Sequence, residues 1–439
     1  MTTPIVLLLL LAVSFAVSRV IRRYAERVVV LSGVEYVLVG VLLGPQLPPY
    51  LLTADTMEVV QPLLALLVGL LGFLVGLRSG QETMSGPSWA VGTLSAVCVL
   101  AAVCGAFVWA AELLAVPVPE NSEWIVVELY RAWEHRLVLS FAESNLALGL
   151  SVGSAACVAS ASLIETTRGQ LGVRGPQGGV LLALAETSQW VGITGLGMSL
   201  ALARSSTAGL GVGLTEWALI ALSLGGICGV LFSLFIGRET DPHRVFLAAI
   251  GAVTFASGIG SALGVSPLFV NLVAGWTVAR TSGHAQAVRR EMQRLSHPLF
   301  VMTMLLAGAM WEPVSGLWWL LPVGYLVVRF LARFIFVQAF GQALLEVRGR
   351  LYNGLWSQGT LAAAIAVSVV QRFPERASIV LSTVLMGSLV SELFSHRLLR
   401  AVLVDAGENA TEVAEPTAAA EPAPGPVFPR GSQLGKETP

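Results

Sequence analysis

Long apolar runs recur along most of this chain, and each is long enough to cross a bilayer, which takes roughly 20 residues of helix. Hydrophobic residues make up 55% of the 439 positions and charged residues only 12%. Soluble domains carry about 25% charged residues, and a β-barrel would show short alternating segments instead. The pattern therefore predicts an all-α polytopic membrane protein.

Charged and Gly/Pro breaks divide these runs into about thirteen predicted transmembrane spans. They fall near residues 4–18, 28–45, 57–77, 88–115, 138–164, 179–203, 213–236, 245–263, 266–281, 297–311, 315–341, 353–373 and 377–396. Only LGVSP separates the eighth span from the ninth, so a count of about twelve also fits. Residues 1–403 form the predicted transmembrane domain. Residues 404–439, rich in Ala, Pro, Glu and Gly, are a predicted disordered cytoplasmic tail.

The arginines test this division, because basic residues favour the cytoplasmic side of a membrane protein. Loops after odd-numbered spans hold most of them: Arg19, Arg22, Arg23, Arg27, Arg78, Arg168, Arg174, Arg238, Arg244, Arg289, Arg290, Arg294, Arg348 and Arg350. Loops after even-numbered spans hold fewer: Arg131, Arg136, Arg204, Arg372 and Arg376. This alternation predicts a multi-pass plasma-membrane protein with its N-terminus outside and its C-terminus in the cytoplasm.

The sixth predicted span carries unusual polarity in LALAETSQWVGI, where Glu186 precedes Thr187, Ser188 and Gln189. An ionisable residue at mid-membrane costs at least a few kcal/mol, so it needs a partner, a water-filled cavity or a function. Glu186, Gln189 and Trp190 share one helical face. This pattern indicates an ion- or proton-binding site, although a protonated carboxyl that only packs helices together would also produce it.

Two arginines lie inside the eleventh predicted span, and Arg329 and Arg333 share a face at i and i+4. Arginine keeps its proton, so these side chains must find anions, carbonyl groups or water. Arg329 could pair locally or reach the membrane surface, whereas Arg333 lies deeper and is the predicted core basic residue. Glu35, Glu143 and Glu392 are expected outside the central site, with Glu392 near the interface.

Small residues dominate the fifth span from Gly149 to Ser162, and Gly354, Ser357, Gln358 and Gly359 interrupt the twelfth. Such a run can be a tight packing face, or a helix that unwinds at its centre to coordinate an ion. The two spans occupy matching places in spans four to six and eleven to thirteen. The second group is inverted relative to the first, which predicts inverted repeats with two discontinuous, crossing helices, broken near residues 155–162 and 354–360. This arrangement is typical of a secondary transporter.

Several function classes are disfavoured. The only lysine, Lys436, lies in the tail, so the chain has no nucleotide-binding P-loop. The four cysteines, Cys98, Cys104, Cys157 and Cys228, lack metal-ligand spacing. With a net charge of −1, we expect no nucleic-acid partner, no enzymatic activity, no cofactor and no metal beyond a transported monovalent cation.

Five segments, in order, resemble motifs of the monovalent cation–proton antiporter superfamily of sodium/proton exchangers. They are VGVLLGP (39–45), LLGFLVGLRSG (70–80), GVSPLFVNLVAGWTVART (264–281), HPLFVMTMLLAGAMWE (297–312) and FLARFIFV (330–337). The resemblance runs from Glu35 to Arg400 and implies a homodimer of two-domain protomers. The scaffold would comprise residues 1–77 and 245–311, and the mobile core residues 88–203 and 315–399. Glycines 40, 44, 72 and 76 would permit close contact between helices in the dimer.

The resemblance also implies a site. The unwound part of the family's fifth span falls on Ala159 to Ser162, and the core basic residue falls on Arg333. Aligned through Gly192 and Ile193, the family's acidic pair falls on Ser188 and Gln189, so its aspartates are missing here.

Three functions fit these residues. The first is exchange of a monovalent cation (Na⁺ or K⁺) for protons, with Glu186 facing Arg333 and Ser160, Ser162, Thr187, Ser188 and Gln189 nearby. Exchange through a single carboxylate would be electroneutral. The second is a non-coupled sensor, regulatory or channel-like protein on the same scaffold. The third is an anion or organic-acid transporter, with Arg333 as the counter-charge and Ser160, Ser162 and Ser188 as donors.

Overall fold

The computed structural model describes residues 33–45, 54–78, 86–114, 143–173, 175–207, 212–236, 241–314, 316–345, 350–373 and 377–405, and the regular elements in these ranges are all helices. Seven helical spans in these ranges are long and apolar enough to cross a membrane. The fold class expected from the sequence is thereby confirmed. The predicted first span, 4–18, and the tail from residue 406 lie outside the described residues.

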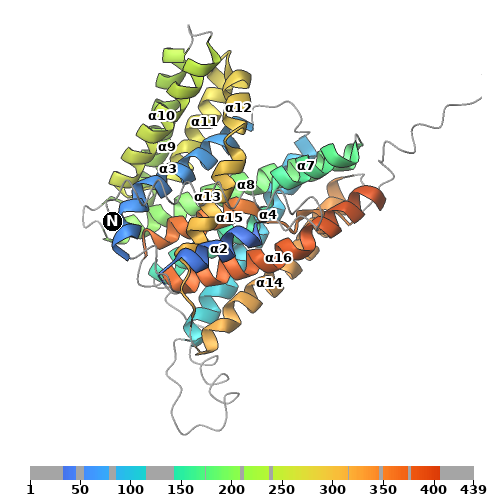
Figure 1. Cartoon of the computed structure of the whole chain (residues 1–439). Helices are drawn as coiled ribbons and strands as arrows, with labels where there is room; N and C mark the ends of the chain where they lie inside the picture. Colours follow the sequence, from blue (N-terminus) through green and yellow to red (C-terminus); the bar gives the residue numbers. More distant parts are fainter. Residues whose placement is uncertain are drawn as a thin grey trace, which may run out of the picture.

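The α-helices follow one another along the chain from Val34 to Asp405 (Figure 1). Their bounds are α2 Val34–Leu43, α3 Ala54–Arg78, α4 Gly86–Leu114, α6 Glu143–Cys157, α7 Ala161–Leu171, α8 Pro176–Thr207, α9 Leu214–Ile236, α10 Pro242–Leu263, α11 Pro267–Thr281, α12 Ala285–Gln293, α13 Ser296–Ala309, α14 Leu320–Leu344, α15 Gly359–Val370 and α16 Ala377–Asp405. Two 3₁₀ turns, η1 Gly316–Trp319 and η2 Leu351–Leu355, precede α14 and α15 respectively.

The short segment LGVSP does separate two helices, which decides in favour of the larger span count at this point. Gly264 ends α10 with φ 73°, a left-handed conformation that glycine adopts without strain. Ser266 then caps α11 by accepting a hydrogen bond from the Phe269 N–H at 3.3 Å, and Pro267 occupies the first turn. Both signals, the helix-ending glycine and the Ser-Pro pair that starts the next helix, can be recognised in the sequence.

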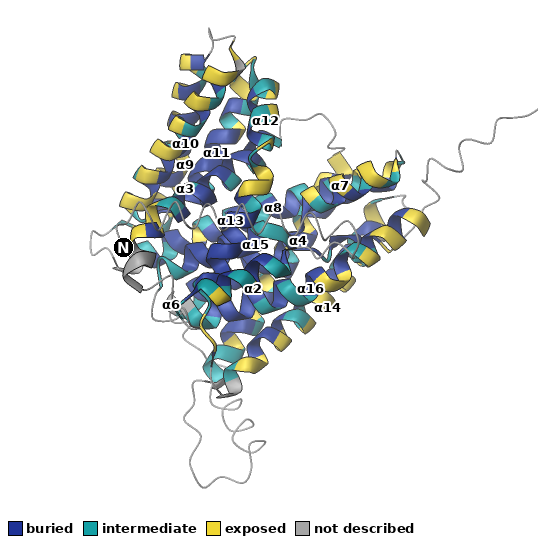
Figure 2. Ribbon diagram, in the orientation of Figure 1, coloured by how far each residue is buried: buried dark blue, intermediate teal, exposed yellow. Residues whose placement is uncertain are grey.

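The helices pack in two groups, here called the α11 group and the crossover group. In the α11 group, α11 packs against α3 and α9, and α10 contacts all three; α12 lies at the end of this group. In the crossover group, α4 packs against α6, α8 and α14, and α15 packs against α6 and α16 (Figure 1). Buried residues occupy the region where the groups meet, whereas many residues of α9, α10 and α14 are exposed (Figure 2).

The glycines expected to allow helix contact in a dimer instead face helices of the same chain. A Cβ at Gly40 would overlap the Leu305 carbonyl oxygen of α13, and a Cβ at Gly72 would overlap that of Leu268 in α11. Gly44 and Gly76 face the same two helices. These glycines therefore allow close packing within one chain, and the expected homodimer stays a prediction without their support.

The three aspartates of the chain, Asp55, Asp241 and Asp405, all lie at helix ends. Asp55 lies in the first turn of α3, and Asp405 is the last residue of α16. Helix α16 thus extends slightly past the predicted start of the tail at residue 404. Asp241 caps α10 by accepting a hydrogen bond from the His243 N–H at 3.0 Å.

Candidate functional site

The fifth span is broken at its centre, as predicted. Helix α6 ends at Cys157, the chain is not helical at residues 158–160, and α7 begins at Ala161. Ser160 caps the new helix by accepting a hydrogen bond from the Leu163 N–H at 3.4 Å. Its own backbone N–H donates to the Ser357 carbonyl at 2.8 Å, which joins this break to the second one.

The twelfth span is broken in the matching place. Turn η2 ends at Leu355, and α15 begins at Gly359 with a φ of 63°. A Cβ on Gly359 would lie 2.8 Å from the Ser160 hydroxyl oxygen. Both the backbone conformation and the space therefore require glycine where the two broken helices cross. The predicted crossing of two discontinuous helices is confirmed.

Helix α8 holds the first break through two neighbouring residues, Ser188 and Gln189. The Ala159 N–H donates to the Ser188 hydroxyl at 3.0 Å, and the Gln189 amide donates to the Ala159 carbonyl at 2.9 Å. A non-helical residue buried in a membrane protein needs partners for its backbone groups. Ser188 and Gln189 supply those partners with neutral side chains.

Arg329 and Arg333 of α14 bind the carbonyl ends of both broken helices. Arg333 donates to the carbonyls of Cys157 at 2.6 Å, Val158 at 2.7 Å and Leu355 at 2.6 Å. Arg329, 2% exposed, donates to Ala156 and Trp356 at 2.9 Å each. Positive charge at helix C-termini is stabilising. Of the two alternatives for Arg329, local pairing is the one observed. Arg333 donates to backbone carbonyls, so the expectation that it faces Glu186 is wrong, and its role as the core basic residue stays a prediction.

Glu392 of α16 is the acid of this crossing, and its expected place at the interface is wrong. Its side chain is 4% exposed, and Oε1 accepts from the Ser357 hydroxyl at 2.6 Å and from the N–H groups of Gln358 at 3.0 Å and Gly359 at 2.8 Å. The carboxyl group thereby caps the N-terminus of α15. The sequence held one signal that we missed: Ser388 and Ser395 lie four residues before and three residues after Glu392, on the same helical face.

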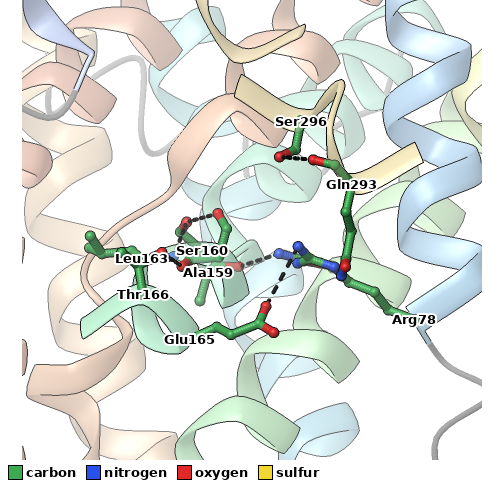
Figure 3. A network of polar contacts seen from close by, with 10 residues as sticks. Arg78, Ala159, Ser160, Leu163, Glu165, Thr166, Gln293 and Ser296 are labelled. Carbon is green, nitrogen blue, oxygen red and sulfur yellow. Dashed lines mark hydrogen bonds and ion pairs between the residues drawn. The ribbon is translucent and has the colours of Figure 1, made fainter. Parts of the chain in front are cut away.

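Glu186 lies on α8 close to this crossing but outside its hydrogen-bond network. Its side chain is partly buried and forms no hydrogen bond with any residue in the described ranges. The charged groups that act on it are Arg78, Glu165 and Arg289. Figure 3 shows Arg78 extended towards Glu165, beside Ala159 and Ser160 at the first break. Charges of both signs therefore act on Glu186, but none of these groups forms a hydrogen bond with it.

The remaining predicted site residues fall in different places. Thr187 donates to the Ala183 carbonyl at 2.9 Å and faces Gly92 of α4, so it lies away from the break. Ser162 lies on an exposed side of α7, with its hydroxyl 3.1 Å from that of Ser160. The structure therefore brings Ser160, Ser188, Gln189 and Arg333 together at the crossing and leaves Thr187 out.

Two buried amide oxygens at the crossing are unused within the part of the chain that the structure describes. They are Oε1 of Gln189 and Oε1 of Gln358, whose side chains are 6% and 0% exposed. The Gln358 amide nitrogen donates to the Ala155 carbonyl at 2.8 Å and to the Tyr325 hydroxyl. Such oxygens can accept a proton donor or bind a cation without adding charge.

Among the described residues, no three His, Cys, Asp or Glu side chains gather closely enough to hold a metal ion. The polar groups around the crossing are single carboxyl groups and neutral oxygens.

Comparison with solved structures places the chain in a known class of fold, that of the sodium/proton antiporters. One similar structure is the sodium proton antiporter MjNhaP1 from Methanocaldococcus jannaschii, with a TM-score of 0.63 and 14% sequence identity. The likeness covers 90% of this chain and 96% of that one, and at this identity it shows the fold alone. Neither a family model nor a curated protein sequence matches the chain.

Proposed function

We propose that this chain is a secondary transporter that exchanges a monovalent cation, Na⁺ or K⁺, for protons, with Glu186 as the exchanging group. One observation carries this proposal. Of the acidic side chains near the crossing, Glu392 accepts at least four hydrogen bonds and Glu165 pairs with Arg78, whereas Glu186 forms no hydrogen bond with the described residues. A group that binds a proton and a cation in turn must be able to release both.

The charges at the crossing support exchange of cations more than transport of an anion. Arg329 and Arg333 direct most of their N–H groups at backbone carbonyls, whereas the buried Nε of Arg333 has no acceptor among the described residues. Ser188 likewise binds backbone on both sides, accepting from Ala159 and donating to Ala185. An incoming anion would have to displace these contacts, whereas a cation needs only the carboxylate and nearby neutral oxygens.

The shared fold adds independent support. MjNhaP1 is a sodium proton antiporter, and the present chain has the same arrangement of helices over most of its length. Crossed, discontinuous helices at mid-membrane are the part of such folds that binds ions while the two domains move relative to each other. In this proposal the crossover group is the mobile core, the α11 group is the scaffold of a homodimer, and the C-terminus is cytoplasmic.

Electroneutral exchange follows from the number of groups that can release a proton. Glu186 can give up a single proton when a monovalent cation arrives, and the arginines keep theirs. The cycle then moves no net charge, so membrane potential should have little effect on its rate.

Proton flux in proteoliposomes tests the proposal, with sodium, potassium and lithium added in turn. The wild-type protein should release protons in response to at least one of these cations. Glu186→Gln should abolish the response, and Glu186→Asp should retain part of it because a carboxylate remains. Glu35→Gln is the matched control: it removes a partly buried carboxyl from α2, away from the crossing, and should preserve exchange.

The alternatives predict other results. A response that survives in Glu186→Gln would show that another group exchanges the proton. A folded wild-type protein that is silent with every cation would favour a non-coupled sensor, regulatory or channel-like protein on this fold. Flux that depends on the anion supplied would favour an anion or organic-acid transporter.

A further inference from the structure

Four charged side chains lie along the boundary between the two helix groups, near the first break, and two of them, Arg78 and Glu165, form an ion pair. Arg78 ends α3 and Arg289 lies on α12, both in the α11 group. Glu165 lies on α7 and Glu186 on α8, both in the crossover group. Basic residues on one side thus face acidic residues on the other, and Arg78 and Arg289 both act on Glu186.

We propose that Arg78 is a tethered competitor of the transported cation, which sets the apparent cation affinity of Glu186 by moving between Glu186 and Glu165. This proposal rests on the proposed function, because it assumes that Glu186 binds the transported cation and adds the Arg78 guanidinium as a competing cation. It makes Arg78 a specificity-determining residue that acts through Glu186, although it lies on a different helix group.

The Arg78–Glu165 contact is loose enough for such an exchange. The guanidinium Nη2 lies 3.7 Å from Glu165 Oε2, which is an ion pair beyond hydrogen-bond length. Arg78 is 17% exposed, whereas Glu165 is 58% exposed, so the arginine lies deeper than its partner (Figure 3). Its buried Nε has no hydrogen-bond acceptor among the described residues. The guanidinium therefore has donors to spare for a second carboxylate.

Glu165 and Glu186 consequently compete for a single guanidinium. Arginine stays charged, so it attracts either carboxyl group whenever that group is ionised. When Arg78 favours Glu165, Glu186 is open to a cation from solution. When Arg78 turns to Glu186, it opposes the binding of both the cation and the proton there. Glu165 thus helps the cation to bind by drawing Arg78 away.

Two substitutions break the same ion pair and should change cation affinity in opposite directions. Arg78→Ala removes the competitor, so the apparent KM for the cation should fall. Glu165→Gln leaves Arg78 with Glu186 alone, so the KM should rise. Each change should be about threefold to tenfold, as expected for one charge acting across several ångströms of partly solvated protein. If Arg78 only fastened the two helix groups together, both variants would change the KM in the same direction.

Proton competition gives a second readout. Without Arg78, Glu186 should hold its proton more firmly, so the pH midpoint of exchange should move to more alkaline values. The other charged groups acting on Glu186 are Glu165 and Arg289, and both stay in place in this variant. Measurements of KM belong well above that midpoint, where protons no longer compete with the cation.

Two control variants isolate the charge of Arg78. Arg78→Lys keeps a cation at the position and should stay within about twofold of wild type, since charge dominates the effect. Arg294→Ala removes an arginine from another ion pair, with Glu291 at 2.8 Å, within and just beyond α12. Arg294 is 77% exposed, so its loss should leave the KM unchanged.

Cation binding to the purified protein, followed as cation-dependent thermal stabilisation, tests the same idea without transport. The half-saturating concentration should fall in Arg78→Ala and rise in Glu165→Gln. Equal or same-direction shifts would overturn the tethered-competitor role while leaving exchange through Glu186 intact. No stabilisation of either the wild type or Arg78→Ala by sodium, potassium or lithium would overturn it as well. Loss of exchange in Glu186→Gln bears only on the proposed function.

Discussion

Glu392 and Glu186 are two carboxyl groups near one crossing of helices, and their surroundings differ in kind. Around Glu392, each oxygen accepts hydrogen bonds and two buried arginines balance the nearby backbone carbonyls. Around Glu186, charges of both signs lie near but none forms a hydrogen bond with it in the described residues. The first environment fixes a structure, whereas the second leaves a group available for exchange.

This contrast explains how the crossing can form without a hydrogen bond to Glu186. The broken helices need positive charge at their carbonyl ends and an acceptor at the N-terminal end of α15, and Arg329, Arg333 and Glu392 provide both. Ser188 and Gln189 complete the backbone hydrogen bonds from α8. The backbone groups of the crossing therefore find partners without a contact to Glu186, which frees Glu186 from a structural role.

Arg333→Ala should have the largest effect on stability. The change leaves the buried carbonyls of Leu355, Cys157 and Val158 without their donor. Losing one member of a buried charged network costs about 3–5 kcal/mol. We expect a strong fall in the thermal unfolding midpoint in detergent, measured by tryptophan fluorescence. The unfolding midpoint of Arg333→Lys should lie between those of the wild type and Arg333→Ala, because lysine keeps the charge but lacks the planar guanidinium group. An unchanged midpoint in Arg333→Ala would mean that these carbonyls do not depend on the guanidinium.

Glu392→Gln should have a smaller but clear effect. The amide oxygen can still accept hydrogen bonds from the start of α15, but the charge is lost and the amide nitrogen faces the Ser395 hydroxyl. Replacing a charged acceptor in this way costs about 1–3 kcal/mol. Ser395→Ala is a suitable comparison, since it removes a single bond to Oε2 and should cost only about 1 kcal/mol. Equal costs for the two variants would show that the charge of Glu392 is unimportant.

Sequence reasoning reached the fold because its signals are local. The glycine and serine breaks of the fifth and twelfth spans, and the Gly264–Pro267 boundary, each specify backbone geometry within a few residues. The pairing of charged side chains, by contrast, is not set by local sequence. Arg333 bonds to residues about 175 positions away, and Glu392 caps a helix 33 positions before it. Which acid meets which arginine depends on how the helices pack, so Glu186 was wrongly paired with Arg333.

Glu186→Gln should affect stability least of the three changes. The side chain is partly exposed and has no described hydrogen bond to lose, so we expect a change of about 0.5 kcal/mol or less in the free energy of unfolding. The same thermal unfolding measurement checks this. A large loss of stability would place Glu186 with Glu392 as a structural acid and would remove the contrast between the two sites.

Proton release on cation binding tests most directly whether Glu186, and not Glu392, is the exchanging group. The purified protein, in weak buffer with a pH indicator, is mixed with the cation that drives flux in vesicles. The wild type should release about one proton per chain, because binding of the cation to Glu186 displaces its proton. Glu392→Gln, where folded, should release the same amount, and Glu186→Gln should release none. Release that persists in Glu186→Gln and disappears in folded Glu392→Gln would contradict this assignment.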